Sequence, residues 1–142
     1  MYNKFRYIYK AKGQTSNRWY KGWIERVSEN VVILKTTDFR NSWICSTETL
    51  CQCTCKEDIN KKLIWEHDIV KIKYIDNCEI HEDIVAVEWD EYGFSPFTWQ
   101  YNCDGCVLSA EITSIEVIGN IFDNPELLEE CKKELIKDQI EI

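Results

Sequence analysis

The chain has 142 residues, a length typical of one domain and sufficient for a hydrophobic core without disulfide bonds or a structural metal. Seventeen basic and 25 acidic side chains give a net charge of −8, which excludes direct nucleic-acid binding and membrane-surface binding as first expectations. The N-terminus is charged and aromatic, unlike a signal peptide, and no apolar run approaches the ~20 residues of a membrane span. We therefore expect a cytoplasmic protein.

Short apolar runs rich in β-branched and aromatic residues predict a mainly β protein. Alternation of apolar and polar residues is clearest in Phe5–Tyr9, Ile69–Ile75 and Ile84–Trp89. Polar residues 56–62 are expected to form a turn, and residues 90–97, which contain a glycine and a proline, are expected to form a loop. The predicted strands are Phe5–Tyr9, Trp19–Val27, Val31–Leu34, Trp43–Thr54, Ile69–Ile75, Ile84–Trp89 and Ile112–Ile121.

One helix is predicted near the end of the chain. Asn124 is a favourable N-cap residue, Pro125 suits the first helical position, and acidic residues follow in the first turn. Leucines and a cysteine at helical spacing give one apolar stripe as far as about Lys137. The expected fold is therefore mainly β (α+β), with antiparallel short-strand sheets or small barrels and one C-terminal helix. We expect one domain over residues 1–142, with two small β subdomains divided near residues 55–65 as the alternative.

Four segments in order along the chain resemble the YopX family, whose members are encoded by phages and prophages. The most specific is the tail from Glu116 to Leu128, which includes Gly119-Asn120 and Asn124-Pro125. The others are Lys4-Phe5-Arg6, the central Ile64-Trp65-Glu66-His67-Asp68-Ile69-Val70, and Val87-Glu88-Trp89 with Gly93-Phe94. The resemblance implies a small, mainly β protein of unassigned biochemical role, and it brings no catalytic residues or cofactors.

The motif residues are expected to be structural. His67 stands where the family motif ordinarily has glycine, and if that position requires a positive φ, the histidine must tolerate it. Asp68 is a short acceptor that can close the turn before the following strand. The segments before the motif, Thr54-Cys55-Lys56 and Glu57-Asp58, also depart from the family pattern. The residues with this expected role are Ile64, Trp65, Glu66, Asp68, Gly119, Asn120, Asn124 and Pro125.

Eight cysteines in a chain without an export signal favour reduced thiols over disulfides. Cysteine thiolates are common zinc ligands, and the candidates for a zinc site in this chain are Cys51, Cys53, Cys55, Cys103 and Cys106. Alternate residues of a strand lie about 7 Å apart, however, too far for several thiolates to reach one metal unless the strand bends. We therefore expect core and turn cysteines, no metal and no cofactor, with zinc binding or a redox pair as the less favoured alternatives.

Histidine lies beside carboxylates at Glu66-His67-Asp68 and at His81-Glu82-Asp83. A general base or a metal site needs such neighbours, but adjacent residues on a strand point to opposite faces. The sequence also contains no phosphate-binding glycine loop and no nucleophile elbow. We therefore expect no enzymatic activity.

Three classes of function remain. The first is a non-enzymatic module that self-associates or docks a protein through exposed aromatic residues. The second is an acidic decoy that binds a host DNA-binding or defence protein in the cytoplasm of an infected cell. The third is an enzyme with an unrecognised site. The candidate interaction surface for the first class consists of Trp43, Tyr92, Phe94, Phe97, Trp99 and Tyr101.

Overall fold

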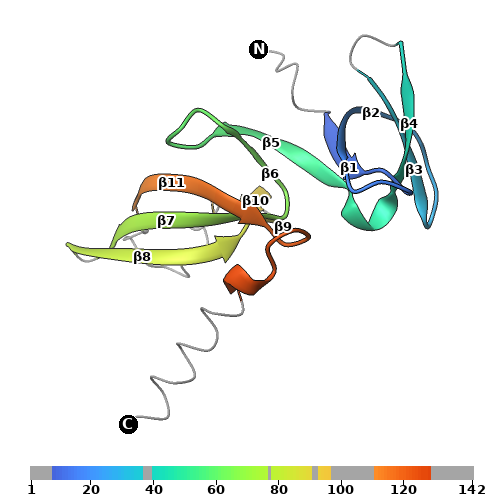
Figure 1. The fold of residues 1–142 in the computed structure, drawn as a ribbon. Coiled ribbons are helices and arrows are strands. Elements are labelled where there is room, and N and C mark those ends of the chain that lie inside the picture. The colour runs from blue at the N-terminus through green and yellow to red at the C-terminus, as the bar shows by residue number, and fades with distance from the viewer. Residues whose placement is uncertain (1–7, 37–39, 77, 91–92, 97–110, 129–142) are drawn as a thin grey trace, which may run out of the picture. The chain divides into compact units, whose positions relative to one another are not determined.

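A computed structural model describes residues 8–36, 40–76, 78–90, 93–96 and 111–128. The chain forms two compact units, Met1–Lys56 and Glu57–Ile142. Strands dominate both units and pair in antiparallel fashion, which confirms the predicted mainly β fold (Figure 1). No closed barrel is present within these ranges, and none of the helical residues they contain forms a segment long and apolar enough to cross a membrane.

The first unit contains one sheet in which the strands follow the order β4-β3-β2-β1-β5. The bridge between Gly13 and Cys45 joins the end of β1 to β4, so the first four strands curl toward each other. The elements are β1 Tyr9–Lys12, β2 Trp19–Val27, β3 Val31–Lys35, β4 Ser42–Ser46, the 3-10 turn η1 Thr47–Thr49, and β5 Cys51–Glu57.

One face of this sheet forms the core of the first unit. Ala11, Val32, Leu34 and Cys45 are fully buried there. Tyr9, Tyr20, Ile24 and Leu50 pack around them, and Tyr20 stacks on Trp43 with 4.4 Å between ring centroids. Because side chains alternate along a strand, the residues between these core positions lie on the opposite face of the sheet.

The second unit is built on the three-stranded sheet β11-β7-β8, with β7 in the centre. Ile64, Val70, Ile72 and Val87 form its buried core. The elements are β6 Leu63–Trp65, β7 Asp68–Asp76, β8 Glu79–Ala86, β9 Glu88–Asp90, β10 Gly93–Ser95 and β11 Glu111–Asn120, and residues 126–128 are helical.

Several predicted boundaries are wrong. The predicted strand Trp43–Thr54 is two strands, because Thr49 donates its hydroxyl to the carbonyl of Ser46 at 2.9 Å and the intervening residues form η1. Strand β5 continues through Glu57, so the turn predicted over residues 56–62 is shorter and begins at Asp58.

The predicted loop over residues 90–97 is also partly wrong, because it contains the strand β10. Trp89 lies opposite Phe94 in the antiparallel pair that β10 forms with β9. Their rings meet edge to face at 4.8 Å, and such an aromatic cross-strand pair stabilises a short hairpin. The predicted strand Ile84–Trp89 is correspondingly divided at Val87 into β8 and β9.

At the end of the chain, the first helical residues follow Pro125, close to the predicted start. The remainder of the helix predicted as far as Lys137 lies outside the described residues.

Candidate functional site

The central family motif forms a tight turn between β6 and β7. Asp68 is buried, and its Oδ2 accepts a hydrogen bond from the backbone N–H of Trp65 at 2.8 Å, which confirms the predicted turn-closing role. His67 has φ 70, the left-handed conformation in which the family has glycine. Its N–H donates to Val87 at 2.7 Å, and its carbonyl accepts from Ile121 at 3.0 Å. These bonds give the motif a structural role.

The side chain of His67 sits between polar and aromatic neighbours. Its Nε2 lies 4.0 Å from Oε2 of Glu66, and its ring meets Phe122 edge to face at 5.6 Å. Its Nδ1 is buried without a hydrogen-bond partner.

The tail motif closes a second turn after β11. The side chain of Asn120 accepts hydrogen bonds from Phe122 and Asp123 at 3.0 and 2.9 Å. The Oδ1 of Asn124 accepts the N–H of Asn120 at 3.3 Å, so the prediction that Asn124 caps the helix with its side chain is wrong. A Cβ at Gly119 would lie 2.6 Å from that same oxygen, which explains why glycine is required here.

Asp58 is the buried polar residue that sequence reasoning missed. Only 7% of it is exposed, yet its Oδ1 accepts the backbone N–H groups of Asn60 and Lys62 at 2.8 and 2.9 Å, and its Oδ2 accepts that of Val117 at 2.9 Å. Burial acts to raise the pKa of this carboxyl, but the three backbone bonds outweigh it and hold the pKa below its ordinary value. The only sequence signal was an aspartate opening a polar turn.

Asp58 also ties its turn to the edge strand β11. Ile59 donates its N–H to the carbonyl of Ile115 at 2.9 Å, alongside the bond between Asp58 and Val117. The turn therefore satisfies polar groups on β11, and these bonds give Asp58 a structural role.

The cysteines in the first unit do not converge on a metal. Cys45, Cys51, Cys53 and Cys55 are free thiols, and burial raises the pKa values of Cys45 and Cys53. No group of three or more potential metal ligands lies together anywhere in the described ranges. Cys103 and Cys106 fall outside those ranges.

The second histidine cluster follows the alternation of strand β8. His81 stacks on Tyr74 at 5.2 Å, and its Nε2 lies 3.7 Å from Oε2 of Glu79. The hydroxyl of Tyr74 donates to Asp83 at 3.1 Å. Glu82 pairs instead with Lys71 at 3.0 Å, so His81 and its immediate neighbour do not act together.

Two residues of the candidate aromatic surface can be located. Trp43 is 37% exposed and stacks on Tyr20 of its own unit, while Phe94 packs against the core of the second unit. Tyr92, Phe97, Trp99 and Tyr101 lie outside the described residues.

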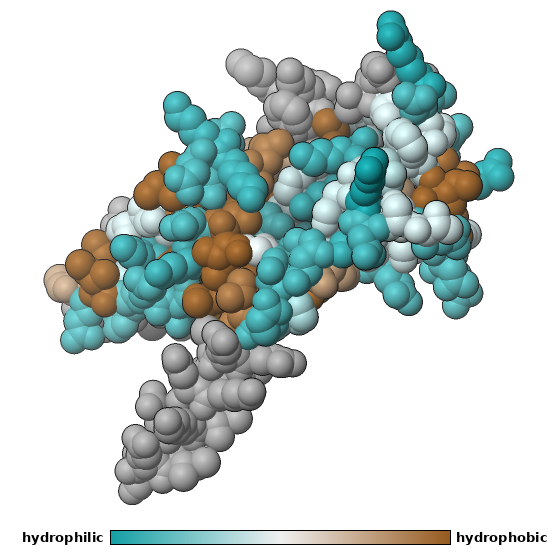
Figure 2. Space-filling view, viewed as in Figure 1, coloured by the Kyte–Doolittle hydropathy of each residue, from teal (hydrophilic) through white to brown (hydrophobic). Residues whose placement is uncertain are grey.

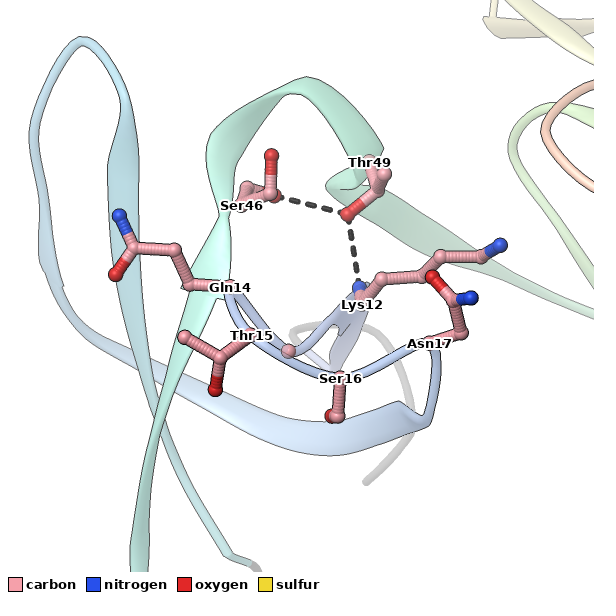
Figure 3. A pocket seen from close by; sticks show the side chains of 8 residues that line it. Lys12, Gln14, Thr15, Ser16, Asn17, Ser46 and Thr49 are labelled. Carbon is pink, nitrogen blue, oxygen red and sulfur yellow. Dashed lines mark hydrogen bonds between the residues drawn. The ribbon is translucent and has the colours of Figure 1, made fainter.

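A polar hollow of about 340 Å³ opens beside the β1–β2 loop (Figure 3). Thr49 connects two sides of its lining, since its Oγ1 accepts the N–H of Lys12 at 2.8 Å and donates to the carbonyl of Ser46 at 2.9 Å. The lining carries hydroxyls, amides and one ammonium group but no carboxylate, which suits a hydroxylated or anionic ligand. It consists of Lys12, Gly13, Gln14, Thr15, Ser16, Asn17, Ser46 and Thr49.

Comparison with protein families matches residues 4–129 to the family described as YopX protein. The match covers both units and includes the central and tail motifs. No curated protein and no solved structure matches the chain.

Proposed function

We propose that this chain, which belongs to the YopX family, is a phage- or prophage-encoded cytoplasmic module that self-associates and has no catalytic activity of its own. The observation that carries the proposal is the exposed apolar pair at the hairpin end of β7 and β8 in the second unit's sheet. Ile75 and Ile80 lie directly opposite each other in the pairing of β7 with β8 and are 37% and 77% exposed.

Figure 2 shows an apolar (brown) group over the end of the sheet where β7 runs into β8, the end at which Ile75 and Ile80 are paired. Within the described residues, β8 is the edge of its sheet and pairs only with β7. An exposed edge with large apolar side chains favours association with a second sheet. Glu82 on this strand is paired with Lys71, which reduces the charge repulsion between two such edges.

Light scattering coupled to size exclusion tests the proposal. We expect a mass of at least twice 16.9 kDa at micromolar protein, and Ile80→Asn should shift it toward the mass of the single chain. Val27→Asn is the matched control, because Val27 is 53% exposed and lies in the other unit. A mass of 16.9 kDa at every concentration would overturn self-association.

A second candidate is the acidic decoy, and the charge of the second unit favours it. Residues 57–142 carry 21 acidic and 7 basic side chains, a density suited to a basic, DNA-binding surface of a host protein. An affinity capture from host cytosol should then retain a basic DNA-binding protein in stoichiometric amount, and retention should fall as salt is raised. Capture of the same amount at high salt would contradict an electrostatic decoy.

A further inference from the structure

Three cysteines alternate along β5, and a change in backbone direction brings the second and third of them together. Cys55 has φ 67, in the left-handed region that residues other than glycine rarely adopt. A residue in this conformation turns its Cβ bond away from the direction that an extended strand would give it. The expectation that alternate cysteines stay apart on a straight strand therefore does not hold for Cys53 and Cys55.

Cys55 contacts Cys53 through both its backbone and its side chain. The N–H of Cys55 donates to Sγ of Cys53 at 3.4 Å, and Sγ of Cys55 donates to the carbonyl oxygen of Cys53 at 4.0 Å. Burial raises the pKa of the Cys53 thiol, and the Cys55 thiol also raises that pKa because the two side chains interact directly. The two sulfur atoms are therefore neighbours.

The backbone separation of this pair suits a disulfide bond. Residues two apart on a strand have Cα atoms about 6.6 Å apart, and the Cα atoms of disulfide-bonded cysteines lie about 4.4–6.8 Å apart. On a straight strand the obstacle to such a bond is the parallel direction of the two Cβ bonds. The left-handed conformation of Cys55 removes this obstacle for Cys53 and Cys55.

The exposure of the cysteines in the first unit decides which thiol meets an oxidant. Cys51 is 1% exposed and donates to the carbonyl of Thr49 at 3.2 Å, and Cys45 is fully buried and donates to the carbonyl of Trp43 at 3.7 Å. Cys55 is only half-buried. Because thiol reactivity requires access from solvent, Cys55 is the first of these thiols to react.

We propose that Cys53 and Cys55 form a redox modification site, at which glutathione disulfide oxidises the two thiols to an intramolecular disulfide. The Cys55 thiolate attacks one sulfur of glutathione disulfide, which forms a mixed disulfide and releases one glutathione thiolate. The Cys53 thiol then gives its proton to water, and its sulfur attacks Sγ of Cys55. This second step forms the Cys53–Cys55 bond and releases the second glutathione.

The electrons and protons of these two steps balance. Two cysteine thiols are oxidised to one disulfide, and one glutathione disulfide is reduced to two molecules of glutathione. The two protons that the cysteines lose pass through water to the two glutathione thiolates. A ring closed across a single intervening residue is strained, and strained disulfides are readily reduced, so an excess of reduced glutathione reverses the reaction.

The position of the pair gives the modification a structural consequence. Cys55 directly precedes Lys56, the last residue of the first unit. A bond between Cys53 and Cys55 fixes the conformation of the chain where that unit ends. In a cytoplasmic protein, a reversible disulfide of this kind is typical of redox sensing rather than of permanent cross-linking.

Mass spectrometry of the full chain treated with glutathione disulfide tests this proposal. After oxidation of the folded chain, the free thiols are alkylated in denaturant and the chain is digested with trypsin. Cys53 and Cys55 fall in one tryptic peptide, residues 41–56, which contains four cysteines. We expect this peptide to lose two hydrogen atoms and to carry two alkyl groups, and treatment with excess reduced glutathione before alkylation should restore four.

Three variants assign the bond. Cys55→Ser should lower the yield of disulfide in this peptide at least ~10-fold, because the pair held close together is lost. Cys51→Ser is the matched control, since it removes another cysteine of the same strand, and it should leave the yield unchanged. Cys53→Ser should stop the reaction at the mixed disulfide, with one glutathione bound to Cys55. Cys53→Ala takes its place if the buried hydroxyl prevents folding.

Three results would overturn the proposal: four alkyl groups on the peptide after oxidation, equal losses of disulfide in Cys51→Ser and Cys55→Ser, or a wild-type reaction that stops with glutathione on Cys55. The wild-type chain oxidised in urea provides a further test. The same bond at the same yield in the unfolded chain would also refute the proposal, because the fold would then contribute nothing to the pairing.

Discussion

Replacing Asp58 by alanine should destabilise the second unit strongly, because one buried carboxylate satisfies three backbone N–H groups. The N–H of Val117 would lose its partner on β11, and an unsatisfied donor of this kind costs about 1–3 kcal/mol. Asn60 and Lys62 are exposed, so water can replace their partner at about 0.5–1 kcal/mol each. The expected loss in the free energy of unfolding is therefore about 2–5 kcal/mol, a large part of the stability of a small domain.

Chemical denaturation followed by circular dichroism measures this loss. Asp58→Asn should lose less, about 1–2 kcal/mol, since the amide keeps the shape and one acceptor oxygen. Glu57→Ala is the matched control, because Glu57 is an exposed carboxylate one residue earlier, and it should stay within ~0.5 kcal/mol of the wild type. A loss below ~1 kcal/mol for Asp58→Ala would refute the reasoning.

The same carboxylate predicts a pH dependence. Its folded-state pKa lies below the ordinary value of 3.8, so its charged form stabilises the fold. That stability is fully present above the unfolded-state pKa and is lost as the pH falls through the lowered folded-state pKa. The difference between the wild type and Asp58→Ala should hence be constant above about pH 5 and shrink below pH 4. A difference that grows on acidification would contradict this sign.

The remaining predictions concern the two motif turns and the cysteines. His67→Val should cost about 2 kcal/mol more than His67→Gly in urea denaturation, since a β-branched residue fits a positive φ poorly; equal midpoints would contradict the strained turn. Gly119→Ala should cost about 1–3 kcal/mol through its clash with Asn124, and adding Asn124→Ala should recover part of that loss; strict additivity would refute the contact. Elemental analysis should find no stoichiometric zinc, and a chelator should leave the denaturation midpoint unchanged; one zinc per chain lost together with the fold would overturn this.

Local patterns in the sequence predicted a structural feature correctly where the interaction that causes the feature is between residues close in the sequence. Asp68 closes the two-residue turn between β6 and β7, and its role followed from a short acceptor placed at the start of a predicted strand. The glycine that the family motif ordinarily has at position 67 raised the question of a positive φ, and only the structure shows that His67 adopts one, φ 70. Alternation over β7 predicted that strand within one residue at each end, because the side chains of a half-buried strand repeat every second residue.

Interactions between residues far apart in the sequence could not be predicted from such local patterns. Asn124 has the residue type of a helix cap, but its oxygen faces Asn120 because β11 and the following turn bring that N–H nearer. Asp58 looked like one more polar turn residue, and its partner Val117 lies 59 positions away. No local pattern reports a hydrogen bond over that separation.

The sequence by itself determined the β character, the family and the net charge, since each follows from residue types and their spacing. Tertiary structure decided which charges stand together. Pairing of β1 with β2 puts Lys10, Lys12 and Lys21 on the face that carries Trp19, while the acidic residues belong mostly to the other unit. Electrostatic attraction falls off over a Debye length of about 10 Å, so a ligand responds to the face it touches rather than to the total charge of the chain.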